Sequence, residues 1–448
     1  MKSGPTFHKK ITAQLFLAIL AGANVLTLAL SARPIQDDYS ILSNLATKGF
    51  LEGLKDSWNT MGGNVAPLAT RSAFLSPSLT GKTWVGLFLF TLFVAVMVSI
   101  SSVLLMRSFS TTYFSCQEYF IVLALTILGF EGLLSPGAIG AFQFGAASAV
   151  HLLSVCYGVI AISLCFHKSK LSFLGIAIFG VACGNSSLAE SLTLFAVCIS
   201  LLVSTYFSKS VRFSSPRNSR LIVLIIANVL GLVTILIAPG FRNRANNQIG
   251  VKNSLDKLPV HFVTSFIDIV GDFIAHPIWI FALIFGLLNK QSSNTFTIRR
   301  RFIILPIVGI LLLDIVGGSL AYPAWHQTLG IYVLATPLCY IFASSLPRNS
   351  IFQFVRNHSK TFTIFVLLFL SLQFVRILPL SVSRAEKWDR NFVLNSCNLK
   401  KDPAAQLRGA EILYPPLNVG VSDVSTWTWM ADSYRIWVRF AVSPPSNC

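Results

Sequence analysis

The sequence predicts an all-α polytopic membrane protein with about eleven transmembrane helices. Apolar runs long enough to cross a bilayer recur along most of the 448 residues, and hydrophobic residues make up 54% of the chain. Charged residues make up only 12%, whereas soluble domains carry about 25%. The mean hydropathy is +0.68. This composition excludes an ordinary soluble enzyme.

The expected spans each approach the ~20 apolar residues that a bilayer core requires. They are residues 11–30, 84–106, 118–134, 147–166, 171–184, 187–207, 221–238, 262–288, 302–320, 328–346 and 361–380. The fifth and sixth are short and are separated at Gly184 and Asn185. This interruption favours a broken or re-entrant helix pair that faces a cavity.

The positively charged residues are concentrated in alternate loops between the expected spans. The 35 Lys and Arg residues against 17 Asp and Glu give a net charge of +18, which in a soluble protein would suggest nucleic acid. Here every second loop is basic, with Lys9, Lys10, Arg107 and 299–301 as examples. Cytoplasmic loops carry such an excess, so we expect a cytoplasmic N-terminus, an outer C-terminus and no nucleic-acid partner.

The expected organisation is a transmembrane catalytic bundle over 1–380 followed by a short outer segment over 381–448. The first outer loop, 31–83, is long. Its apolar residues recur at helical spacing, which predicts an amphipathic helix at the interface. They are Ile41, Leu42, Leu45, Phe50, Leu51, Leu54 and Trp58. The C-terminal segment is expected to pack over the outer mouth of the bundle. Its Cys397 and Cys448 could form a disulfide if that segment faces an oxidising compartment, and whether they pair stays open.

Carboxylates near the predicted outer face are the first candidates for chemistry, because ionisable groups in or near a bilayer are costly. Asp37 and Asp38 follow the first span. Either one could take a proton from a hydroxyl or bind a divalent cation such as Mg²⁺ or Mn²⁺, although an Asp pair also caps helices. Glu190 lies one turn into an apolar helix. It is a candidate functional carboxylate, and it could also be a buried partner of a nearby cation.

Cations at the same face are candidates for anion binding. Arg242, Asn243 and Arg244 follow the seventh span, and paired guanidiniums suit phosphate oxygens. Arginines beside a span are otherwise common headgroup anchors. His326 precedes the tenth span. It could bind phosphate or move a proton, or it could be an interfacial histidine beside a tryptophan.

Four short segments in chain order resemble the GT-C class of membrane glycosyltransferases, and more narrowly a large family of polytopic bacterial proteins. They are DDY at 37–39, GNSSLAES at 184–191, APGFRNRA at 238–245 and RAEKWDRN at 384–391. The family shows an early DD, a helix-embedded Glu, a PGN-like turn with a following Arg, and an Asp/Arg segment after the last span. This chain departs from the pattern at Phe241, where the family often has Asn, and Asn243 follows two positions later.

The resemblance implies an inverting glycosyltransferase in the bacterial inner (plasma) membrane. The donor would be a polyprenyl-phosphate-linked sugar, and the acceptor a glycan, lipid or protein at the outer face. By position, Asp37 or Asp38 would be the general base and a possible metal ligand. Arg242 and Arg244 would stabilise the leaving phosphate. Glu190 would be a further catalytic residue that orients acceptor or sugar hydroxyls. Substrate or phosphate contacts would come from Tyr39, Asn185, Asn243 and His326.

Three other functions fit the same composition. A transporter or flippase for a lipid-linked glycan would have a similar vestibule, although inverted repeats are common in such proteins and none is evident here. A polymerase or ligase for preformed glycans would use similar arginines. A purely structural membrane protein explains least, because it has no reason to gather acids and cations at one face.

Overall fold

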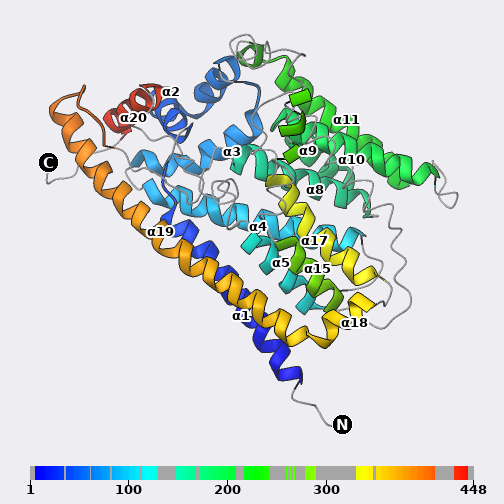
Figure 1. Ribbon diagram of the computed structural model, residues 1–448. Helices are drawn as coiled ribbons and strands as arrows, with labels where there is room; N and C mark the ends of the chain where they lie inside the picture. The colour runs from blue at the N-terminus through cyan, green and yellow to red at the C-terminus, as the bar shows by residue number, and fades with distance from the viewer. Residues whose placement is uncertain are drawn as a thin grey trace.

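The computed structural model is all-helical throughout the part of the chain that it describes (Figure 1). No described residue is in a β-strand. The described residues are 6–34, 37–60, 62–80, 83–109, 114–129, 148–167, 169, 171–207, 216–242, 259–260, 262–264, 266–267, 278–288, 329–346, 350–408 and 428–441.

Most of the helices form an apolar bundle. They are α1 (Thr6–Ser31), α4 (Thr83–Phe109), α5 (Cys116–Gly129), the π-helix η2 (Ser148–Leu152) that leads into α8 (Leu153–Cys165), α9 (Leu171–Gly184), α10 (Leu188–Phe207), α11 (Pro216–Leu236), α15 (Ile278–Leu288), α17 (Leu329–Ser345), α18 (Ser350–Asn357) and α19 (Ser359–Lys401). The remaining elements lie at one end of the bundle and are called the cap, together with the end of α19 (Figure 1). They are α2 (Asp37–Thr60), α3 (Val65–Leu75), the 3-10 helix η1 (Ser76–Thr80) and α20 (Thr428–Ala441).

Three helices of the described chain are long and apolar enough to cross a membrane. They cover Trp84–Ser108, Arg217–Leu236 and Ser359–Lys401, and six further apolar helices are shorter. This confirms that the described part of the chain is all-helical and has helices with membrane-spanning potential, while the count of about eleven spans stays a prediction. The expected span 302–320 and the stretch 268–277 lie outside the described residues.

The helix α19 is longer than the sequence predicts. The last span was expected to end at 380, but the helix continues through Pro379 to Lys401. α1 and α19 run side by side from one end of the bundle to the cap (Figure 1). There the guanidinium of Arg33 donates two hydrogen bonds of 2.7 Å to the carboxylate of Asp389. The first loop and the C-terminal segment therefore begin at the same end of the bundle, as the predicted topology requires.

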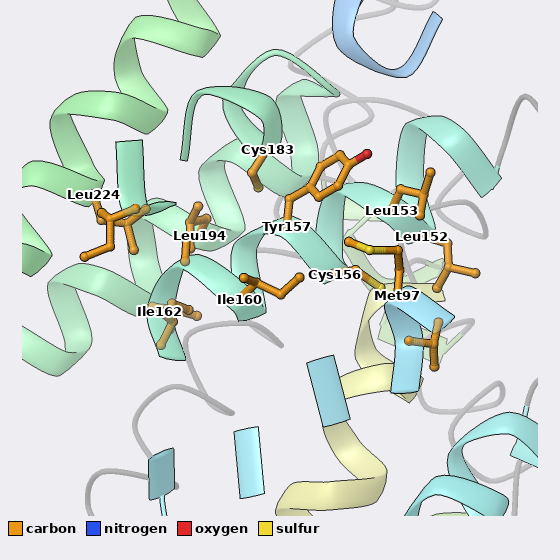
Figure 2. Packing of buried hydrophobic residues seen from close by; sticks show 14 of the residues in the cluster. Met97, Leu152, Leu153, Cys156, Tyr157, Ile160, Ile162, Cys183, Leu194 and Leu224 are labelled. Carbon is orange, nitrogen blue, oxygen red and sulfur yellow. The ribbon is translucent and has the colours of Figure 1, made fainter. Parts of the chain in front are cut away.

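The helix α8 occupies the centre of the largest hydrophobic cluster of the described residues. Its side chains pack between those of α4 on one side and those of α9, α10 and α11 on the other (Figure 2). The labelled members from α8 and η2 are Leu152, Leu153, Cys156, Tyr157, Ile160 and Ile162. This core fixes the start of α8, where η2 leads into it. η2 carries His151, which belongs to the candidate site described below.

Small residues bring α9 and α11 into close contact. A Cβ atom at Gly184 would lie 2.1 Å from the carbonyl oxygen of Asn228, and one at Gly231 would lie 2.4 Å from that of Val181. Gly180 lies one turn before Gly184 on the same face of α9. Membrane helices commonly use this spacing of small residues for close backbone packing. The glycines therefore fix the position of the α9–α10 turn relative to α11.

The cap has a hydrophobic core of its own, built from α2, α3, α19 and α20. The amphipathic helix expected within 31–83 is present as α2, with a kink at Gly49, whose φ of 76° favours glycine. Leu42 before the kink is fully buried, whereas Leu51 after it is 78% exposed. Cys397 in α19 is disulfide-bonded, and Cys448, its expected partner, lies outside the described residues.

Candidate functional site

A buried ion pair joins the first turn of α2 to α3. Arg71 donates from Nε to Oδ1 of Asp38 at 2.9 Å and from Nη2 to Oδ2 at 2.7 Å. The side chains of Arg71 and Asp38 are 2% and 0% exposed. The Arg71 guanidinium also lies over the ring of Phe90 in α4, at 4.4 Å from its centroid. The predicted acidic residue Asp38 is therefore neutralised by a cation from its own loop.

Arg71 retains one donor group that no described residue uses. Its Nη1 atom is buried and has no hydrogen-bond partner. Arg71 is not among the predicted site residues. The signal that could have found it is a lone cation in the otherwise uncharged segment VAPLATRSAFL.

A second buried pair joins η2 to the start of α10. Nδ1 of His151 lies 2.6 Å from Oε1 of Glu190, and Glu190 is only 7% exposed. The two atoms share one short hydrogen bond, in which the tautomer of the imidazole sets donor and acceptor. The S-x-x-E sequence from Ser187 to Glu190 is typical of a capping box, in which the Glu reaches back to the capping residue. Here the Glu190 carboxylate contacts His151 in a different helix.

The second oxygen of the Glu190 carboxylate takes no part in the contact with His151. Its Oε2 atom is buried, and no described residue forms a hydrogen bond with it. The partner His151 belongs to a π-helical turn, and such turns are frequent at functional sites. His151 was missed in the sequence, although a histidine inside an apolar segment is a signal that could have found it.

The two pairs lie on adjoining elements. α3 packs against η2, and the side chain of Thr70, next to Arg71, lies near the Tyr157 hydroxyl of α8. One turn earlier in α8, Ser154 donates to the carbonyl oxygen of Cys183 at 3.4 Å, just before the α9–α10 turn. Polar contacts therefore continue from the cap, through α8, to the turn that carries Glu190.

Asn185 fastens this turn to the cap and to α11. Its Oδ1 accepts the N–H of Ala66 at 2.7 Å, and its Nδ2 donates to the carbonyl oxygen of Gly63 at 2.8 Å and to Oγ1 of Thr234 at 2.6 Å. The side chain thus uses both donors and one acceptor on the protein itself. The contacts place Asn185 as a structural link beside Glu190.

Replacing Asn185 with alanine is expected to destabilise this link by about 1–3 kcal/mol, because the buried carbonyl group of Gly63 and the half-buried N–H of Ala66 lose their partner. Hydrogen exchange of the peptide 62–67 measures the effect as faster exchange of the Ala66 amide. Asn64→Ala is the matched control, since Asn64 forms no capping hydrogen bond with α3. Equal exchange in both variants would contradict the role of Asn185.

Tyr39 lies in the cap core. Its hydroxyl donates to the carbonyl oxygen of Pro34 at 2.9 Å and accepts Nε1–H of Trp388 at 3.1 Å. Its ring packs against those of Tyr434 and Trp437 in α20. These contacts join the DDY segment to the C-terminal helices, and the predicted substrate contact of Tyr39 stays a prediction.

Other predicted site residues are placed only in part. Arg242 is exposed on a helical turn that follows α11, whereas Asn243, Arg244 and His326 lie outside the described residues, as does the side chain of Asp37. Within the described ranges, no group of three or more His, Cys, Asp or Glu residues could hold a metal ion. Both oxygens of Asp38 accept from Arg71, so a Mg²⁺ or Mn²⁺ ion at Asp38 would have to displace this contact.

Comparison of the chain with protein-family models, with curated proteins and with solved structures finds no match. The GT-C resemblance therefore depends on its four short segments. Three of them carry residues whose positions the structure describes at the cap end, namely Asp38, Glu190 and Asp389.

Proposed function

We propose that the protein is a GT-C-like glycosyltransferase of the bacterial inner membrane. It transfers a sugar from a polyprenyl-phosphate donor to a hydroxyl of a glycan, lipid or protein at the outer face. The observation that carries this proposal is the placement of two carboxylates and their partners, the buried Asp38–Arg71 ion pair and the Glu190–His151 contact, on adjoining elements at the capped end of an apolar bundle.

The charges match what the reaction requires. A carboxylate accepts the proton of the acceptor hydroxyl as its oxygen attacks the anomeric carbon. The bond from that carbon to the phosphate oxygen breaks, and the polyprenyl phosphate leaves with the electron pair. Cations stabilise the negative charge that grows on the leaving group. A single carboxylate base is sufficient for inversion, so a second nucleophilic carboxylate is not needed.

The surroundings suit a lipid-linked donor. α9 and α11 expose large apolar side chains along their outer sides, including Leu174, Ile178, Ile226 and Leu230. A polyprenyl chain among membrane lipids can pack against such a surface, while its phosphate remains at the bundle end. Arg242, exposed beyond α11, is a cation of the kind that a phosphate at this end would contact.

The test is transfer by membranes that contain the protein. A panel of labelled polyprenyl-phosphate hexoses is supplied, and the label in a hydroxyl-bearing acceptor fraction is counted. We expect transfer from at least one donor and none from membranes without the protein. Movement of an intact lipid-linked glycan across the bilayer, with no transfer from any donor, would favour a flippase. Use of diphosphate-linked glycans alone would favour a polymerase or ligase.

A further inference from the structure

We infer that Glu190 is the residue that accepts the proton from the acceptor hydroxyl, and that His151 positions its carboxylate for this step. The inference depends on the proposed transferase function and makes it more specific. The resemblance gave the proton transfer to Asp37 or Asp38, and made Glu190 a catalytic residue that orients hydroxyls without accepting their proton.

Asp38 is poorly placed to take up a proton. Both of its oxygens already accept hydrogen bonds from Arg71, and both side chains are almost fully buried. Protonation of Asp38 would leave the buried guanidinium without its counter-ion, and removing one partner of a buried pair is strongly destabilising. The pair is better suited to hold the start of α2 against α3.

Glu190 has the free acceptor that this step requires. One oxygen, Oε1, is engaged by His151, while the other, Oε2, is buried and without a partner among the described residues. A buried acceptor that lacks a hydrogen bond is unfavourable. A substrate hydroxyl that donates to Oε2 removes this penalty and places its proton on the oxygen that receives it.

His151 fixes which oxygen is free. Its Nδ1 lies 2.6 Å from Oε1 and donates to it in the Nδ1–H tautomer, so the carboxylate cannot rotate without breaking this bond. In the reaction the acceptor O–H bond breaks and its proton binds Oε2. The acceptor oxygen bonds to the anomeric carbon, and the polyprenyl phosphate departs with the electrons of its bond to that carbon. His151 contacts Glu190, so it is a positioning residue.

The experiment measures kcat and KM of the full-length protein in nanodiscs, with the donor identified by the membrane assay. Glu190→Gln keeps the shape of the side chain but removes its basicity, so kcat should fall about 10²–10⁴-fold while KM changes little. His151→Leu removes the donor and should lower kcat at least about tenfold. His151→Asn presents an amide N–H near the position of Nδ1 and should recover most of that loss.

Each outcome bears on a separate claim. A wild-type protein that transfers no sugar from any donor contradicts the proposed function. An active wild type whose Glu190→Gln variant keeps kcat within tenfold contradicts the role of Glu190 alone. If His151→Asn is as impaired as His151→Leu, the positioning role is wrong. Should Glu190→Gln fail to fold, Glu190→Asp is used. It keeps the carboxylate but withdraws it by one methylene, and an unchanged kcat would overturn the inference.

Discussion

Replacing Arg71 with methionine is expected to lower the free energy of unfolding by about 3–5 kcal/mol, because the buried carboxylate of Asp38 loses its counter-ion. Methionine keeps most of the apolar volume, so the effect reports the ion pair more than packing. Thermal unfolding in detergent micelles measures the loss, and limited proteolysis should locate it in the cap.

Arg33→Met is the matched control for this prediction. Arg33 forms the same two-bonded contact with Asp389, but the Asp389 side chain is 50% exposed, so water replaces the lost guanidinium. A pair of this kind contributes only about 0–1 kcal/mol. Arg33→Met also loses the hydrogen bonds from Nη1 to the carbonyl oxygens of Leu30 and Ala32, and we still expect a smaller loss than at Arg71. If both variants lose the same stability, burial does not explain the importance of Arg71.

Replacing Gly184 with leucine is expected to destabilise the bundle by about 3 kcal/mol or more, above the usual 1–3 kcal/mol of overpacking, because the clash involves backbone. The added Cβ would meet the carbonyl oxygen of Asn228 at 2.1 Å. α9 and α11 would have to separate, and the turn that carries Asn185 and Glu190 would move with them. The thermal midpoint in micelles should fall, and transfer activity should fall with it.

Gly22→Leu provides the control for this substitution. Gly22 lies within α1, and nothing lies within 4 Å of a Cβ built there. Glycine is about 0.8–1.0 kcal/mol less favourable than alanine in a helix interior, and leucine ranks close to alanine, so this variant should be as stable as the wild type or slightly more stable. A loss at Gly22 as large as that at Gly184 would argue against the close α9–α11 contact.

The helices could be predicted from the sequence because apolar length and periodicity are local properties. α9 and α10 begin and end within two residues of the predicted bounds, since Gly184 and Asn185 interrupt the apolar pattern. The extension of α19 to Lys401 could not be predicted. Residues 381–401 are polar by composition, and they stay helical because Trp388 and Asp389 find partners on α2 and after α1.

The candidate site was predictable by residue type but not by contact. Asp38 and Glu190 were singled out because buried carboxylates are costly. Their partners Arg71 and His151 lie 33 and 39 residues away, and no local pattern marks such a pairing. For Asn185 the residue type was noticed but its role was not determined by it. An asparagine in a turn can hydrogen-bond a sugar hydroxyl or a backbone group equally well. Only the geometry shows that it binds Gly63 and Ala66.

The contact between α1 and α19 has a consequence for biosynthesis. Arg33 and Tyr39 leave the ribosome early, yet their partners Asp389 and Trp388 are made some 350 residues later. A growing chain can insert its apolar helices one after another, but it cannot close the cap until translation is nearly finished. A ribosome that stalls before α19 is complete leaves a membrane-inserted intermediate with an unfinished first loop, so the protein should become competent only as its last segments emerge.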